Sequence, residues 1–283
     1  MKQILPIIAI IFFLASCGTN KNAVDNTPIE KTDTTKRMTF NRIIKSSDYN
    51  LKYEKAREYY DAEKYLKALD LYEQLVPFYR GQTRGAEVYF MYCMSNYQSG
   101  DYLYAGYHFK SFYTMYPYTP FAEQALFLSA YCYYLDSPRW SLDQEPTTDA
   151  ISQFQLFLSK FPKSNLVDSC NNLVDTLRYK LEEKSFRAAK LYYDMGYFSA
   201  ATIALNNSIK DFPDSHFREE IYYYIAKSDM KYADGSIYNK QKLRYTQASN
   251  SCKKYIKIFP QGNYIKEIIK IQEQADKNLA KMK

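Results

Sequence analysis

The residue types that usually carry out catalysis are few in this 283-residue chain, and they are not spaced for it. Its two histidines, His108 and His216, cannot build a metal centre that needs several imidazoles. Adjacent carboxylates occur at 182–183 and 219–220, but neighbours on a helix do not face each other, which indicates solvated or capping charges. No nucleophile–base spacing, phosphate-binding loop or dinucleotide fingerprint occurs. The sequence therefore predicts a protein that is not an enzyme and needs no metal or cofactor.

Four of the five cysteines lie in the body of the chain, at Cys93, Cys132, Cys170 and Cys252. They form no C-x-x-C motif, so a zinc ribbon or thioredoxin-type chemistry has no signature here. Cys93 and Cys252 fall on core positions of the repeats described below, where cysteine acts as a small hydrophobe. A disulfide among these four thiols remains open from the sequence.

The fifth cysteine, Cys17, has a chemical context of its own. A short basic start precedes an apolar run over 4–15, which is too short for a membrane-spanning helix of roughly 20 residues but suits an export signal. The run ends in Leu14-Ala15-Ser16-Cys17, which looks like the bacterial lipobox. We expect 1–16 to be a lipoprotein signal peptide and Cys17 to be the lipid attachment site. An ordinary secretory signal with a coincidental cysteine is the alternative.

The residue after this cysteine, Gly18, indicates in which membrane the lipoprotein is anchored, because an aspartate at this position would indicate retention in the inner membrane. We therefore expect a lipid anchor in the outer membrane, with the protein on the periplasmic face. Residues 17–47 are rich in Asn, Thr, Lys and Asp and predict an acylated cysteine followed by a flexible tether. Ser46-Ser47-Asp48 supplies N-cap chemistry for the first long helix.

The net charge of +7 is spread along the chain rather than gathered in one block. Even the most basic stretch, 253–283, has acidic residues interleaved with its lysines. A nucleic-acid binder concentrates its cations on one face, so we expect a solvated helical surface and no nucleic-acid partner.

From Asp48 onward the chain repeats itself. Aromatic–proline pairs close four units at 116–117, 161–162, 212–213 and 259–260, and an alanine lies twelve residues before each proline. Positions eight and five before each proline are mostly large and apolar. Steps of three or four residues are one helical turn, so each set lies along one helix face, and proline ends the second helix of the unit.

This pattern resembles the tetratricopeptide repeat and covers five units. It predicts an all-α fold, an α-solenoid of about five helix–turn–helix repeats whose apolar faces pack against their neighbours. We expect N-terminal repeats 1–3 over 48–163 and C-terminal repeats 4–5 over 164–283. The third unit carries an insert at 137–149 with Trp140, and the fifth carries one at 234–242 between its helices.

A solenoid of this kind offers an inner groove made by the first helix of each repeat. The residues three before, one after and four after the small core residue are expected to line it. Rings with polar tips and one arginine suit capture of an aromatic-rich peptide. Ordinary packing between helices is the alternative for each of these residues. The predicted groove residues are Tyr53, Arg57, Tyr60, Phe90, Met94, Tyr97, Phe127, Tyr131 and Tyr134.

The acylated signal followed by five such repeats resembles the BamD family of outer-membrane protein assembly lipoproteins. The resemblance includes the segments 45–49, 52–56 and 130–138. It implies a scaffold of the β-barrel assembly machinery whose N-terminal repeats receive the carboxy-terminal targeting strand of unfolded outer-membrane barrel precursors. It also implies that the C-terminal repeats dock on the periplasmic POTRA domains of a BamA-like barrel insertase. Charge assigns that docking to Lys253, Lys254 and Lys257.

Two other functions remain open from the sequence. One is a different periplasmic repeat lipoprotein that acts as an envelope or peptidoglycan-linked scaffold. The other is a SusD-like glycan-binding lipoprotein, although those chains are much longer and sugar platforms usually use more than one tryptophan.

Overall fold

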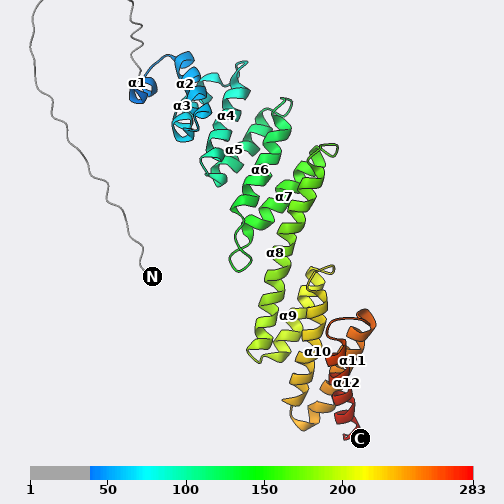
Figure 1. The fold of residues 1–283 in the computed structure, drawn as a ribbon. Coiled ribbons are helices and arrows are strands. Elements are labelled where there is room, and N and C mark those ends of the chain that lie inside the picture. The colour runs from blue at the N-terminus through cyan, green and yellow to red at the C-terminus, as the bar shows by residue number, and fades with distance from the viewer. Residues whose placement is uncertain (1–38, 283) are drawn as a thin grey trace, which may run out of the picture. The chain divides into compact units, whose positions relative to one another are not determined.

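The computed structural model describes residues 39–282, and within them all regular secondary structure is helical (Figure 1). This confirms the predicted all-α fold. The helices are α1 (Phe40–Ile44), α2 (Tyr49–Asp61), α3 (Tyr65–Tyr79), α4 (Gly85–Gln98), α5 (Tyr102–Met115), α6 (Ala122–Asp136), α7 (Glu145–Lys160), α8 (Val167–Asp194), α9 (Phe198–Asp211), α10 (Arg218–Asp234), α11 (Tyr238–Ile258) and α12 (Ile265–Ala280).

The helices from α2 to α11 pack in consecutive pairs, which correspond to the five predicted repeats. Each pair also packs on the next pair, as a solenoid requires (Figure 1). The last helix, α12, has no second helix of its own and packs on α11. Its outer side carries charged residues such as Lys266 and Glu273, both exposed, so it closes the stack with a polar surface.

The repeat positions chosen from the sequence form the core. The alanines at 68, 105, 150, 201 and 248 are all fully buried. The rings of Phe109, Phe112, Phe154 and Phe157 are fully buried as well. The small residues let the two helices of a pair approach, and the rings fill the space beside them. The register of the repeat is therefore confirmed.

Glycines form the turns within two of the pairs, and the helix ends follow the predicted pattern. Gly100 and Gly196 adopt positive φ of 86° and 82° between the helices of their pairs, a conformation that glycine adopts without strain. At the other end, the aromatic residue before each proline donates its backbone N–H to the carbonyl four residues earlier, as Phe161 does to Phe157 at 2.8 Å. Proline then stops the helix, because it has no N–H to continue the ladder.

The structure differs from the sequence prediction at two places. Phe40–Ile44, predicted as part of the tether, form α1, because Ile43 is 1% exposed and Phe40 packs edge-on against Tyr59 at 5.6 Å. In the fifth unit only 235–237 lie between the helices, since α11 begins at Tyr238 and takes up most of the predicted insert.

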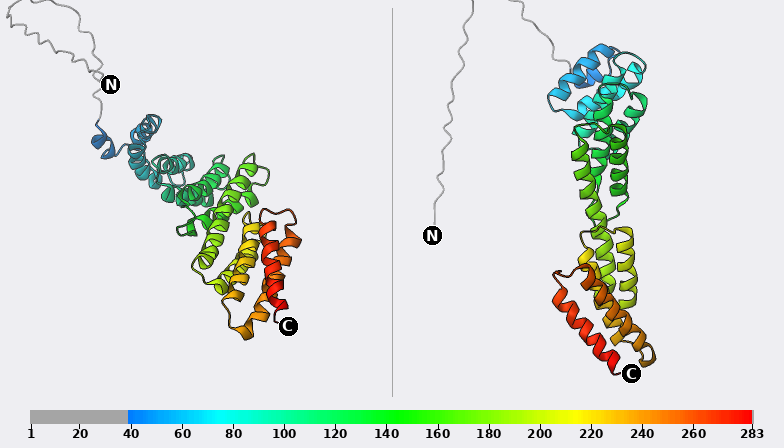
Figure 2. Two further views of the ribbon diagram at one scale, coloured as in Figure 1. Left: turned by 60° about the horizontal axis from the view of Figure 1, so that its bottom comes forward. Right: turned by 90° about the vertical axis from the view of Figure 1, so that its right-hand side faces the viewer.

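The insert of the third unit folds back on α8, the longest helix, which runs from the N-terminal to the C-terminal repeats (Figure 2). Lys180 donates to the Ser137 hydroxyl at 2.7 Å, and Lys184 donates to the Leu142 carbonyl at 2.7 Å. The Arg187 guanidinium lies 5.0 Å from the centre of the Trp140 ring. The tryptophan therefore takes part in an intramolecular brace between repeats 3 and 4.

Candidate functional site

Three rings on α6 form a ladder, which we call the α6 ring ladder: Phe127, Tyr131 and Tyr134. They lie one helical turn apart, and neighbouring centroids are separated by 5.9 Å and 5.7 Å. The planes are nearly parallel, at 11° and 14°. All three side chains are half-buried, so each keeps accessible surface. Phe157 supports the ladder from the core, with its ring edge-on to Phe127 at 5.7 Å.

The aromatic surface continues onto the preceding first helix, α4. Tyr97 and Met94 are half-buried there, and the ring of Tyr97 packs against Tyr102 at 5.8 Å. Burial raises the pKa of Tyr97, and the nearby Tyr131 raises it further. The phenol therefore stays protonated at neutral pH and can donate a hydrogen bond to a ligand.

Two of the predicted groove residues lie in the core instead of on this surface. Tyr53 is 4% exposed, its hydroxyl donates to Glu87 at 2.7 Å, and Arg84 covers its ring at 5.0 Å. Phe90 is 6% exposed and stacks on Phe121 at 4.7 Å. For these two residues the structure shows the packing between helices that the sequence left as the alternative.

The first helix of repeat 1, α2, contributes the remaining predicted groove residues. Arg57 is exposed, with its guanidinium 5.9 Å from the centre of the Tyr53 ring. Tyr60 is half-buried, and its ring lies edge-on to Tyr65 at 5.4 Å. Seven of the nine predicted residues thus retain accessible surface, on three successive first helices. Peptide binding by them stays a prediction.

The predicted docking lysines, Lys253, Lys254 and Lys257, are all exposed on α11. The Lys254 ammonium lies 5.0 Å from the centre of the Tyr222 ring. α11 contains further basic residues at 240, 242 and 244 and no acidic residue, so the whole helix is positively charged. A partner at this surface stays a prediction.

The histidines and cysteines have structural surroundings. His108 is half-buried between the hydroxyls of Tyr89 and Tyr92, at 3.3 Å and 3.5 Å from its two ring nitrogens, and burial lowers its pKa. The four body cysteines are buried and free, and burial raises the pKa of Cys132 to about 12. In the part of the chain that the structure describes, no three His, Cys, Asp or Glu side chains gather as a metal site.

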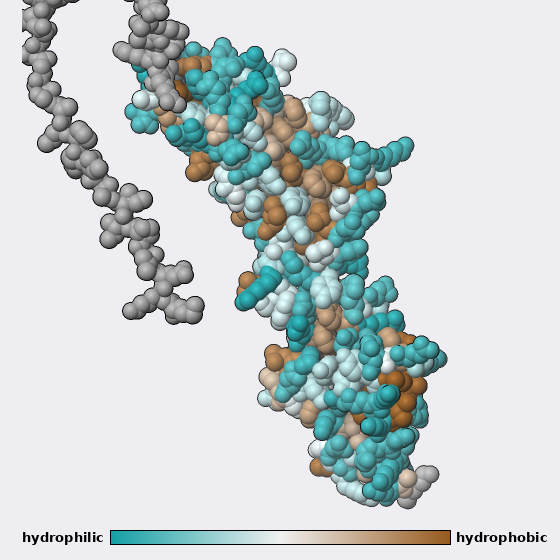
Figure 3. Space-filling view, viewed as in Figure 1, coloured by the Kyte–Doolittle hydropathy of each residue, from teal (hydrophilic) through white to brown (hydrophobic). Residues whose placement is uncertain are grey.

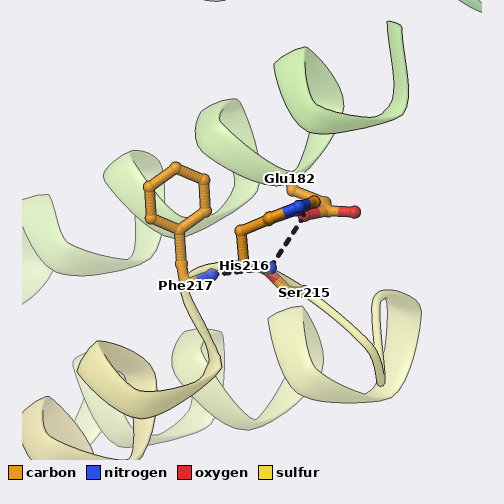
Figure 4. Close-up of polar contacts among 4 residues, drawn as sticks. All are labelled: Glu182, Ser215, His216 and Phe217. Atoms are coloured by element: carbon orange, nitrogen blue, oxygen red, sulfur yellow. Dashed lines mark hydrogen bonds and ion pairs between the residues drawn. The ribbon is translucent and has the colours of Figure 1, made fainter. Parts of the chain in front are cut away.

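Glu182 has a role that its place in the adjacent pair 182–183 did not indicate, since it is 5% exposed and therefore not a solvated charge. Its carboxylate accepts the backbone N–H of His216 at 3.1 Å and also contacts the ring Nδ1 of His216 at 3.0 Å (Figure 4). It thus holds the segment before α10 against α8. A signal was present, because Glu182 shares a helix face with Phe186 and Ala189, both in the core.

The proposed lipid attachment site, Cys17, and the preceding signal peptide lie outside the described residues. None of the described helices is both long and apolar enough to cross a membrane.

Comparison with known proteins identifies a family for this chain. The model of the family YfiO, described as outer membrane lipoprotein, matches residues 46–221, which contain α2 to α9 and the first residues of α10. The match includes the α6 ring ladder. No curated protein matches the chain. Since the matched segment is more than half of the sequence, the chain belongs to the YfiO family of outer membrane lipoproteins.

Proposed function

We propose that this protein is a non-enzymatic scaffold of the β-barrel assembly machinery, anchored in the outer membrane and facing the periplasm. Its N-terminal repeats bind the targeting peptides of unfolded outer-membrane proteins. Its C-terminal repeats dock on the POTRA domains of a BamA-like insertase. The family, whose members include BamD, and the stacked helical pairs support this assignment.

The observation that carries the proposal is the α6 ring ladder. Its parallel, half-exposed rings repeat at 5.9 Å and 5.7 Å, and together with Tyr97 they offer apolar faces with hydroxyl donors. An aromatic side chain of a peptide can pack against such rings edge-on or offset. The peptide backbone can accept hydrogen bonds from the phenols. A carboxy-terminal strand of a barrel, which alternates apolar and polar side chains, has this chemistry.

The expected affinity is modest. An unfolded peptide loses conformational freedom when it binds, which offsets about 2–5 kcal/mol of the contact energy. We therefore expect a dissociation constant of about 1 μM. Weak binding suits a scaffold that must pass its client to an insertase.

Fluorescence anisotropy with a labelled carboxy-terminal barrel peptide tests the groove. Tyr131→Ala with Tyr134→Ala should weaken binding about tenfold, because aromatic anchors dominate such interfaces. Tyr118→Ala is the matched control, since Tyr118 is 99% exposed and outside the groove. Equal affinity of the double variant and the control, or equal binding of a scrambled peptide, would remove the groove from the proposal.

The docking face is tested by membrane pull-down followed by mass spectrometry. The combined change Lys253→Glu with Lys257→Glu should reduce recovery of the insertase, whereas Lys240→Glu with Lys242→Glu on the same helix should not. Recovery of peptidoglycan enzymes without the insertase would instead favour the envelope-scaffold alternative.

A further inference from the structure

A groove lies between α10, the first helix of repeat 5, and the last helix, α12. It encloses about 400 Å³. Each helix faces it with residues at steps of three and four, among them Met230 and Lys231 on α10 and Lys270 and Ile271 on α12. Met230 is buried and Ile271 is half-buried, whereas both lysines are exposed. The groove thus has an apolar floor and a cationic rim.

The acidic residues of this groove already have partners. Glu267 pairs with Lys227 at 3.1 Å and accepts the Tyr223 hydroxyl at 2.8 Å. Asp234 accepts the Tyr245 hydroxyl at 2.9 Å. Neither rim lysine, Lys231 or Lys270, makes an ion pair with any of the residues described by the structure. Their charge is therefore available to a ligand.

A second pocket adjoins this groove at Lys231, which lines both. It encloses about 650 Å³ between the α8–α9 turn and α10, and most of its lining is apolar. Tyr197 and Ile203 reach it from the α9 side and are about three-fifths exposed. The surface of the C-terminal half is mostly hydrophilic in Figure 3, with hydrophobic residues in separate patches. An apolar subsite and a cationic subsite thus lie side by side.

We propose that these two pockets together bind a short extended protein segment that carries an aromatic or aliphatic side chain and, within a few residues of it, a carboxylate. The apolar side chain enters the pocket beside Tyr197 and Ile203. The carboxylate lies between Lys231 and Lys270. A narrow groove between two helices admits an extended chain but not a flat lipid surface.

This site is separate from the proposed function. It lies on repeats 4 and 5 and α12, and Lys231 and Lys270 fall beyond the residues that the family model matches. It also lies on different helices from the α6 ring ladder and uses none of the α11 lysines assigned to the insertase.

The probe is a fluorescein-labelled peptide of glycine and serine that contains one phenylalanine followed by two aspartates. Two companion peptides replace both aspartates by asparagine or the phenylalanine by serine. We expect anisotropy of the full chain in neutral detergent to show binding of the first peptide only. Binding should weaken as sodium chloride is added, because exposed charges are screened. Equal binding of the asparagine peptide would overturn the proposal.

Variants locate the site. Lys231→Gln with Lys270→Gln should weaken binding of the acidic peptide about tenfold, and Ile203→Ser should weaken it about threefold. Lys266→Gln on α12 and Leu243→Ser on α11 are matched controls, since both residues are exposed and line neither pocket. All these positions are on the surface, and thermal unfolding checks that each variant is folded.

Two results would overturn the proposal at this step. One is unchanged affinity of the double lysine variant. The other is loss of acidic-peptide binding in the variant Tyr131→Ala with Tyr134→Ala, which would place that peptide on the α6 ring ladder instead. Failure of the barrel peptide to bind would refute the proposed function and leave this site standing, because the two peptides are measured separately.

Discussion

The adjacent glutamates Glu182 and Glu183 look equivalent in sequence, and the structure predicts that they differ widely in their contribution to stability. Glu182 is buried and accepts the backbone N–H of His216 from the segment before α10. That segment brings Phe217 into a stack on Phe186, with centroids 5.1 Å apart. Glu183 is half-buried, with a side chain 16% exposed, and its carboxylate pairs with the exposed Arg187 at 2.7 Å, one helical turn away. We therefore compare Glu182→Ala with Glu183→Ala.

The expected magnitudes follow from these contacts. A hydrogen bond from a backbone N–H to a carboxylate contributes about 1.5–3 kcal/mol, and the buried methylene adds about 0.8 kcal/mol. Glu182→Ala should therefore reduce the free energy of unfolding by about 2–4 kcal/mol. An i,i+4 helix pair contributes about 0.3–0.5 kcal/mol, so Glu183→Ala should reduce the free energy of unfolding by less than about 1 kcal/mol. Glu182→Gln keeps an oxygen acceptor and should fall between the two.

The assay combines thermal unfolding, followed by circular dichroism, with hydrogen exchange. For a chain of this length the melting temperature should fall by about 5–10 °C in Glu182→Ala and by less than about 2 °C in Glu183→Ala. Exchange should rise first in the amides of 216–221, since repeat arrays open locally. Equal melting temperatures for the two alanine variants, or unchanged exchange at 216–221, would refute the reasoning.

Three further perturbations have defined outcomes. Burial holds the pKa of His108 below its ordinary value of 6.5. As the pH falls, this histidine is therefore protonated in the unfolded chain at a higher pH than in the folded chain. Stability should therefore be lost as pH falls below about 6.5, less so in His108→Gln, and urea unfolding at several pH values measures this. Phe157→Ala should lower the free energy of unfolding by about 3–5 kcal/mol, because it empties a fully buried site behind the α6 ring ladder, as urea unfolding would show. Cys17→Ala should release the protein from membranes, and its persistence in the salt-washed outer-membrane fraction would contradict the lipid anchor.

The sequence was sufficient to predict the repeat architecture, because its signals are local. Alanine, ring and proline recur in register along single helices, and α5, α7, α9 and α11 all end one residue before the aromatic residue of the pair. In every copy, an interval of three or four residues places the two side chains on the same face of a helix. The five units were therefore predictable without knowledge of any contact between them.

The accessible part of the groove was not predictable in the same way. Tyr53, Phe90 and Phe127 occupy the same repeat position, yet the first two lie in the core. Arg84 covers Tyr53, and Phe121 covers Phe90; each covering residue lies immediately before the next first helix. Whether a ring is covered thus depends on a residue from the following repeat, which a pattern within one helix does not contain.

Asp229 shows the same limit for a polar group. It lies three residues after Ala226, at the position where repeats 1, 3 and 4 have tyrosine. The structure buries its carboxylate, which accepts hydrogen bonds from Thr202 at 2.8 Å and Ser251 at 2.6 Å. Burial raises its pKa, and these hydroxyls partly offset the rise. Its donors lie on α9 and α11, so only the packed fold explains why a carboxylate is tolerated.

The residue directly after the small core residue differs in charge and polarity from one repeat to the next. This position holds Arg57 in repeat 1, Met94 and Tyr131 in repeats 2 and 3, and Lys190 and Lys227 in repeats 4 and 5. Both lysines lie over tyrosine rings, Lys190 at 5.1 Å from Tyr224 and Lys227 at 4.7 Å from Tyr223. The same repeat position is therefore apolar or aromatic in repeats 2 and 3 and cationic in repeats 1, 4 and 5, where Lys190 and Lys227 form ion pairs with Asp194 and Glu267.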